Sequence, residues 1–136
     1  MTKGIICDIR DVLVFPEEEY RVNEKLVNFL VSNKEKYGFL IFFSNSKESS
    51  IEKYTNIMPE LFEIVDGEYY PYNSGYVKPD VRGFEKILED FNLQPEEVIF
   101  IDDGRHHVDA AEELGLKTVW YKDKNDFITL KNLLSL

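Results

Sequence analysis

The chain contains the stretch Phe39-Leu40-Ile41-Phe42-Phe43-Ser44-Asn45, in which five apolar residues are followed at once by two polar ones. An unbroken apolar run of this length is typical of a strand that is buried on both faces. Strands of that kind occur mainly in parallel sheets that carry helices on both sides. The stretch therefore predicts an α/β fold.

Similar apolar runs recur on both sides of this stretch, with helical patterns between them. We expect further strands at residues 3–9, 64–65, 98–101 and 117–121, and helices at residues 17–37, 46–57, 84–91, 108–114 and at the C-terminal end. Strands separated by helices are joined by parallel crossovers, so successive strands enter one sheet in the same direction. The prediction is a single domain over residues 1–136, built as a doubly wound (Rossmann-like) parallel sheet of five strands with helices on both faces.

The composition is that of an ordinary globular protein, with 43% hydrophobic and 31% charged residues. No apolar run approaches the ~20 residues that cross a membrane, and the N-terminal run is too short for a signal peptide. The one cysteine, Cys7, cannot form an internal disulfide, and its apolar surroundings predict a buried side chain. We therefore expect a cytoplasmic protein with no membrane partner.

The formal net charge of −10 bears on the choice of partner. Nucleic-acid binding needs clustered Lys and Arg side chains, so no nucleic-acid partner is expected. The electrostatic field of a chain with this negative charge does not attract a phosphorylated substrate either. Attraction must come locally, from a lysine, a metal ion or backbone amides.

Polar side chains follow three of the predicted strands directly. Asp8 ends the first strand, Ser44 follows the second, and Asp102 and Asp103 end the fourth. Ligands of open parallel sheets bind at the carboxyl ends of the strands, so these groups are expected on one edge. Lys78 lies in a loop before a helix, from which its long side chain can reach the same edge.

Four stretches that carry these residues resemble, in order, the four motifs of the haloacid dehalogenase (HAD) superfamily. They are Ile5-Ile6-Cys7-Asp8-Ile9-Arg10-Asp11-Val12-Leu13, Leu40-Ile41-Phe42-Phe43-Ser44-Asn45, Lys78-Pro79-Asp80, and Phe100-Ile101-Asp102-Asp103 continuing to Ala110-Ala111. Each motif alone is weak, but all four in order, each at a strand end or loop, are specific. The resemblance covers nearly the whole chain and implies phosphoryl transfer.

The resemblance also implies a role for each residue. Asp8 would be the nucleophile that forms an aspartyl-phosphate, and Lys78 would neutralise charge on the transferring group. Ser44, with the adjacent Asn45, would bind phosphoryl oxygens, helped by the amides of the following helix. Magnesium would be held by Asp8, the backbone carbonyl of Arg10 and Asp103, with Asp102 acting indirectly or through water. These groups also have structural explanations, because Ser44 or Ser46 can cap a helix and the other residues can occupy turns.

Arg10 departs from the family pattern. The typical first motif of the family resembles Asp-x-Asp, and Arg10 stands at the position of the second Asp. The carboxylate at that position gives a proton to the leaving group and later takes one from water, which a guanidinium cannot do. The sequence leaves three positions open for the Arg10 side chain: solvent, a substrate phosphate, or a pairing with Asp8 or Asp103 in the place of the metal. Asp11 is a candidate to take over the proton transfer, although a neighbouring loop residue is expected to point elsewhere.

A second departure is His107, where relatives often carry Asp or Asn. It can bind a metal or hydrogen-bond Lys78, but an exposed loop position is the stronger expectation, and His106 is expected on the surface. The intervals from Asp8 to Ser44 and from Ser44 to Lys78 leave no room for a cap domain. An uncapped site suits a phosphorylated macromolecule as well as a phosphorylated small molecule, or a homo-oligomer whose partner covers it.

The function that follows is a Mg²⁺-dependent phosphohydrolase that acts through Asp8 and is slow or specialised because of Arg10. General acid–base catalysis contributes roughly 10²- to 10⁴-fold to rate, which is the scale of the expected loss. The alternative is a catalytically degenerate binding or regulatory module. A metal-independent dehalogenase is a further candidate.

Overall fold

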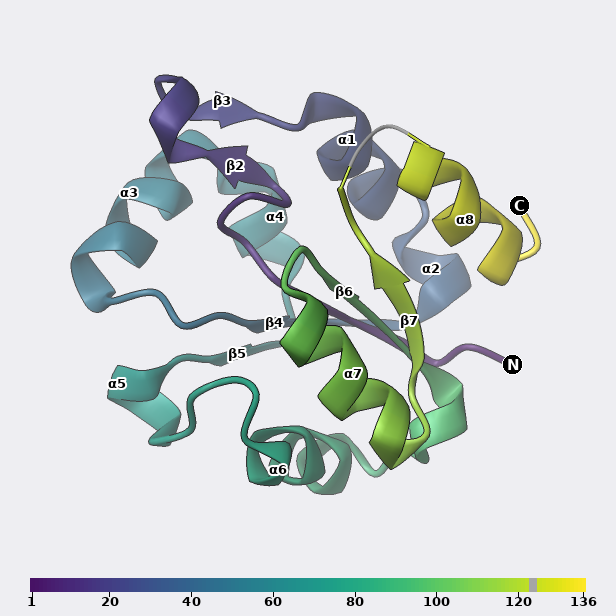
Figure 1. Ribbon diagram of the computed structural model, residues 1–136. Coiled ribbons are helices and arrows are strands. Elements are labelled where there is room, and N and C mark those ends of the chain that lie inside the picture. The colour runs from purple at the N-terminus through teal and green to yellow at the C-terminus, as the bar shows by residue number, and fades with distance from the viewer. Residues whose placement is uncertain (123–124) are drawn as a thin grey trace.

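The computed structural model describes residues 1–122 and 125–136 and has a five-stranded sheet at its centre (Figure 1). The strands lie in the order β5 (Gly67–Tyr69), β4 (Phe39–Phe43), β1 (Gly4–Cys7), β6 (Val98–Asp102) and β7 (Lys117–Trp120). Each neighbouring pair is parallel. The predicted doubly wound parallel α/β sheet is confirmed, and the described residues contain no cap domain.

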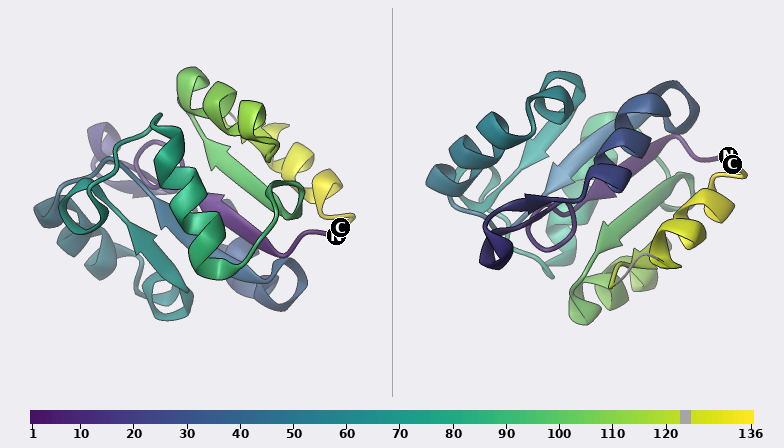
Figure 2. Two further views of the ribbon diagram at one scale, coloured as in Figure 1. Left: turned by 90° about the horizontal axis from the view of Figure 1, so that it is seen from below. Right: turned by 90° about the horizontal axis from the view of Figure 1, so that it is seen from above.

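Helices cover both faces of the sheet (Figure 2). Helices α6 (Val81–Phe91) and α7 (Arg105–Leu114) cover one face, and α1 (Glu24–Ser32), α2 (Lys34–Tyr37), α3 (Glu48–Ile57), α4 (Pro59–Ile64) and α8 (Asn125–Leu133) cover the other. Strand side chains alternate between these faces, so Ile6 and Ile41 pack with α6 while Ile5 and Leu40 pack with α1. Burial on both faces explains why the central strands are apolar without interruption.

The segment after β1 differs from the predicted helix at residues 17–37. It forms a two-stranded antiparallel hairpin, β2 (Val14–Phe15) and β3 (Arg21–Val22), around a 3₁₀ turn, η1 (Pro16–Glu18). Helix α1 begins only after Asn23, whose side chain accepts a hydrogen bond from the Leu26 amide. Val22 fits the helical spacing by coincidence, since it pairs with Val14 instead.

The third strand also lies elsewhere than predicted. Ile64 is the last residue of α4, which begins at Pro59, and the strand is the short edge segment Gly67–Tyr69. An edge strand of three residues carries no apolar run that would mark it in the sequence. A Cβ atom on Gly67 would lie 2.7 Å from the Phe91 ring, so glycine lets α6 pack closely there.

The remaining elements are near their predicted positions, with α3 and α7 beginning at Glu48 and Arg105 rather than at residues 46 and 108. Short turns α5 (Pro71–Ser74) and η2 (Pro95–Glu97) complete the described chain. None of the described helices is both long and apolar enough to span a bilayer.

Candidate phosphate and metal site

The predicted site residues come together at the carboxyl edge of the sheet. Asp8 follows β1, Ser44 follows β4, and Asp102 ends β6. With Lys78 from the loop before α6, they are the buried polar or charged residues of the described chain, tyrosines and Cys7 aside. Buried polar groups are costly unless they are paired, so their gathering at one point marks a built site.

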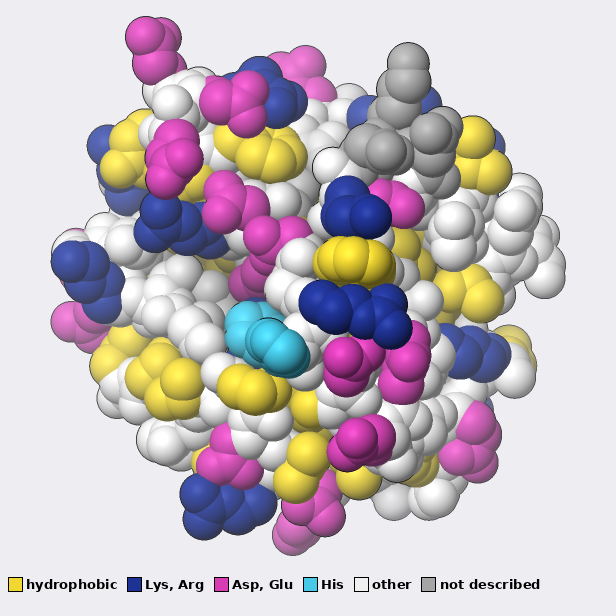
Figure 3. All heavy atoms as spheres, in the orientation of Figure 1, with side chains coloured by type: hydrophobic (Ala, Val, Ile, Leu, Met, Phe, Trp, Pro, Cys, Tyr) yellow, Lys and Arg dark blue, Asp and Glu magenta, His cyan; other side chains and the backbone are white. Residues whose placement is uncertain are grey.

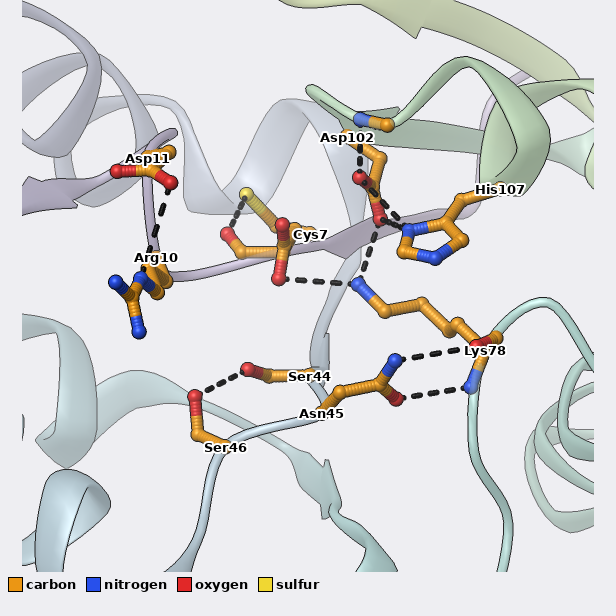
Figure 4. A network of polar contacts seen from close by, with 11 residues as sticks. Cys7, Arg10, Asp11, Ser44, Asn45, Ser46, Lys78, Asp102 and His107 are labelled. Carbon is orange, nitrogen blue, oxygen red and sulfur yellow. Dashed lines mark hydrogen bonds and ion pairs between the residues drawn. The ribbon is translucent and has the colours of Figure 1, made fainter.

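Lys78 lies at the centre of this group (Figure 4). Its Nζ atom is 3.0 Å from Oδ1 of Asp8 and 2.6 Å from Oδ2 of Asp102, and its side chain is 1% exposed. Burial acts to lower the pKa of Lys78, but the two carboxylates outweigh this effect and raise it. Lys78 is therefore a charged group held against Asp8.

Asp102 and Asp103 face different surroundings, because Asp102 is the last residue of β6 and Asp103 lies in the turn that follows it. Asp102 is fully buried and accepts hydrogen bonds from Lys78 and from the Gly104 amide at 2.8 Å. Burial acts to raise the pKa of Asp102, but hydrogen bonds from His107 and Lys78 outweigh it, so the pKa falls. Asp103 instead lines the open cavity beside Asp8.

The acidic cluster fits a hard divalent cation. Carboxylate oxygens of Asp8, Asp102 and Asp103 lie within 4.8 Å of one another, with Lys78 as the cation beside them. Burial raises the pKa of Asp8 to about 7 against the opposing effect of Lys78, and burial also raises the pKa of Asp103. One lysine does not balance three carboxylates, and a bound Mg²⁺ would supply the remaining positive charge through oxygen ligands of the kind it prefers.

His107 is not the exposed loop residue that the sequence predicted. It lies in the first turn of α7, is 25% exposed, and places Nδ1 3.2 Å from both carboxylate oxygens of Asp102. The prediction was wrong because α7 begins at Arg105, which turns His107 toward the end of β6. His106, on the outer side, is exposed as predicted.

Ser44 and Asn45 lie in the loop between β4 and α3. Ser44 Oγ is 2.7 Å from Ser46 Oγ, and α3 begins after Lys47 without a side-chain cap, so neither serine caps that helix. The Asn45 side chain accepts from the Lys78 amide at 2.8 Å and donates to the Lys78 carbonyl at 3.1 Å. Asn45 therefore holds the Lys78 loop, and contact between its side chain and phosphate stays a prediction.

Arg10 lies on the rim of the cavity, away from Lys78 (Figure 4). Its side chain is 55% exposed and makes long ion pairs of 3.8 Å with Asp11 and Glu17. The described ion pairs of Arg10 include neither Asp8 nor Asp103, so it does not occupy the place of a metal. Asp11 has a φ of 64°, a left-handed conformation that aspartate tolerates, and it lines the cavity beside Arg10.

A cavity of about 410 Å³ opens above this cluster, and the sequence interpretation missed part of its wall. Lys47, Ser50 and Tyr54 line it from α3 and the residue before it. Their spacing over two helical turns places them on one face of the helix. The same spacing occurs in any amphipathic helix, so it does not by itself predict that this face lines a cavity. On this face of the molecule the histidines have acidic side chains above them and a basic side chain to their right (Figure 3).

Trp120, at the end of β7, is a second residue that the sequence did not point to. Its indole Nε1 donates a hydrogen bond of 2.9 Å to the backbone carbonyl of Asp103. The cationic groups of Arg105 and Lys122 lie 4.9 and 3.9 Å from the centre of its ring. Trp120 thereby anchors the turn that presents Asp103.

Comparison with known proteins places the chain in a family. The model of the haloacid dehalogenase-like hydrolases matches residues 3–115. One curated relative is a D-ribitol-5-phosphate phosphatase of Bacteroides thetaiotaomicron, which is 33% identical over 43% of this chain and 28% of the relative. Another is a glyceraldehyde 3-phosphate phosphatase of Pyrococcus furiosus, which is 41% identical over 35% of this chain and 20% of the relative. A third, drimenol cyclase drtB of Aspergillus calidoustus, is 27% identical over 93% of this chain. The chain spans about a quarter of the length of these relatives, between 20% and 28%.

Solved structures of similar length share the fold. A predicted HAD-like family hydrolase from Porphyromonas gingivalis superimposes with a TM-score of 0.86 at 19% identity, covering 100% of this chain and 99% of that one. A HAD family enzyme from Bacteroides thetaiotaomicron, in complex with magnesium and inorganic phosphate, superimposes with a TM-score of 0.81 at 16% identity, covering 96% of this chain and 99% of that one. At these identities the superpositions show the fold alone.

Proposed function

The chain belongs to the haloacid dehalogenase-like hydrolases, and from this premise we propose that it is a Mg²⁺-dependent phosphohydrolase acting through Asp8. The observation that carries the proposal is the Asp8 carboxylate, held 3.0 Å from Lys78 Nζ at an open cavity beside Asp103. Two relatives are named as phosphatases of phosphorylated small molecules, which supports the same reaction class.

In the proposed reaction an Asp8 oxygen attacks the phosphorus atom of a phosphate monoester. The bond from phosphorus to the leaving oxygen breaks, and the leaving oxygen takes up a proton from solvent to become an alcohol. Water then attacks the phosphorus of the aspartyl-phosphate, which releases inorganic phosphate and restores the Asp8 carboxylate. Lys78 and the Ser44 hydroxyl stabilise the charge on the phosphoryl oxygens during both steps.

The metal requirement rests on the donor set described above. Asp8, Asp103 and the backbone carbonyl of Arg10 would hold Mg²⁺, and Asp102 would act indirectly because it does not line the cavity. The bound ion would supply positive charge to the phosphate group. A backbone carbonyl does not depend on its side chain, so Arg10 leaves this ligand in place.

Removal of Mg²⁺ is expected to abolish phosphate release from para-nitrophenyl phosphate, because the carboxylates would then repel the substrate. Saturating Mg²⁺ is expected to raise the melting temperature by about 5 °C, since it relieves repulsion within the cluster. In Asp103→Asn, both the Mg²⁺-dependent phosphate release and the rise in melting temperature should be lost. Hydrolysis that persists in EDTA would contradict the proposal and favour a metal-independent hydrolase such as a dehalogenase.

Arg10 makes a slow or specialised enzyme the expected result. Arg10→Asp is expected to raise the turnover of para-nitrophenyl phosphate about tenfold or more, because it places a proton-transferring carboxylate beside Asp8. Arg10→Asn is the matched control, since it removes the cation without adding an acid. An equal gain in both variants would show that the cation inhibits and that proton transfer is not what is missing.

The second candidate function is a catalytically degenerate binding module, and the substitution at Arg10 favours it. Absence of native turnover across a broad phosphoester panel, together with activity gained by Arg10→Asp, would support this alternative. Ordinary enzyme rates in the native protein would exclude it. In either case the ligand is a phosphorylated molecule, and covering of the cavity by a second copy stays a prediction, as does a cytoplasmic location.

A further inference from the structure

The cavity has a second side that the proposed phosphate chemistry does not use. Asp8, Lys78 and Asp103 line the cavity where the reaction is proposed, and we call the other lining residues Arg10, Asp11, Ser46, Lys47, Ser50 and Tyr54 the remaining wall. Hydroxyl side chains stand beside them on this wall, from Ser46, Ser50 and Tyr54. These side chains are therefore free to bind the part of a ligand beyond the phosphate.

The charge on this wall is unusual for the molecule. The chain as a whole has a net charge of −10, yet two basic side chains line this wall, and Asp11 is the acidic one beside them. Lys78, the other cation at the cavity, is already paired with Asp8 and Asp102 at 3.0 and 2.6 Å. Arg10 and Lys47 are thus cations outside the phosphate site, and the acidic groups that face Arg10 are Asp11 and Glu17, each at 3.8 Å.

These two cations are available to a ligand. The ion pairs of Arg10 with Asp11 and Glu17 are 3.8 Å long and solvent-exposed, a kind that contributes little to stability. Lys47 makes no ion pair within residues 1–122 and 125–136. A guanidinium that is not engaged by close partners can bind a carboxylate or a phosphate through two parallel hydrogen bonds.

We infer that the substrate is a small phosphate ester whose leaving group carries hydroxyls and a second anionic group, which Arg10 and Lys47 bind. The inference rests on the proposed function and specifies its substrate class. The second anion is a carboxylate or another phosphate, as in a phosphorylated sugar acid or a sugar bisphosphate. A cavity of about 410 Å³ is within the range of small-molecule sites. Position 10, which holds a proton-transferring acid in many relatives, would then serve substrate selection in this chain.

The test measures binding without turnover. Asp8→Asn, loaded with Mg²⁺, is titrated calorimetrically with two matched pairs of probes: glucose 6-phosphate against 6-phosphogluconate, and fructose 6-phosphate against fructose 1,6-bisphosphate. We expect the probe with the second anion to bind about tenfold more tightly in at least one pair, which corresponds to about 1.4 kcal/mol. Arg10→Gln and Lys47→Gln, each added to Asp8→Asn, should remove most of this preference and leave the affinity for the singly phosphorylated probe within about twofold.

Lys53→Gln is the control, because Lys53 is an exposed lysine of α3 that does not line the cavity. It should leave the preference intact. Equal affinities within both pairs, or equal losses for both members in Arg10→Gln, would overturn the inference. Inorganic phosphate, titrated into the native protein with Mg²⁺, separates the two proposals: if it binds while neither organic pair shows a preference, the inference alone is wrong. If inorganic phosphate does not bind, the proposed function and the inference are both wrong.

Discussion

Asp8→Asn is expected to lower the rate of phosphate release by about 10⁶-fold, the scale seen when an enzyme loses its nucleophile. The amide oxygen is a poor nucleophile, so the aspartyl-phosphate would not form. The substitution keeps the size of the side chain and removes one of three clustered carboxylates, so the fold should persist. The measurement is single-turnover release of phosphate from an aryl phosphate in saturating Mg²⁺.

Asp90→Asn provides the matched control for this experiment. Asp90 is an exposed residue of α6 that pairs with Lys86 and lies outside the cavity, so its loss should leave turnover unchanged. A circular dichroism melt of both variants separates chemistry from folding. If Asp8→Asn kept more than a tenth of the native rate with its fold intact, another residue would be the nucleophile.

Lys78→Met is expected to have the largest effect on stability. It keeps a long apolar side chain but leaves Asp102, which is fully buried, and Asp8 without their cation. Removing one partner of a buried ion pair costs about 3–5 kcal/mol, because the remaining charge stays desolvated. Urea unfolding in the absence of Mg²⁺ measures this loss as a change in the free energy of unfolding.

Two further variants sharpen the stability test. Lys86→Met removes an exposed lysine that pairs with Asp90 at 2.9 Å, and it should change stability little because water screens that pair. The double variant Lys78→Met/Asp102→Asn should recover part of the loss, since it removes an uncompensated buried charge. Equal destabilisation by Lys78→Met and Lys86→Met would contradict the assignment of Lys78 as the electrostatic centre of the site.

The central strands could be predicted from the sequence because their burial is recorded in the residue types. Phe39–Phe43 and Val98–Asp102 are buried along nearly their whole length, and an apolar run is the direct consequence of two covered faces. The edge strand Gly67–Tyr69 is short and partly exposed, so its residues carry no comparable pattern. The hairpin of β2 and β3 exists through pairing of two-residue segments, which local spacing does not encode.

The candidate site likewise has features that the sequence predicted and features that it did not. The sequence by itself determined that Asp8, Ser44 and Asp102–Asp103 meet at one edge, because parallel strands bring their carboxyl ends together whatever the details of the packing. It also determined that the acid expected beside Asp8 is replaced by Arg10, since a residue type is read directly.

Only the tertiary structure decided where these side chains point and what they contact. It turned His107 onto Asp102, bound Asn45 to the backbone of Lys78, and placed Arg10 and Lys47 among the residues that line the cavity. These contacts join residues from different elements, and their geometry depends on where each helix begins and how it packs. Spacing along the chain carries that information for a strand end, but not for a side chain that reaches across from another element.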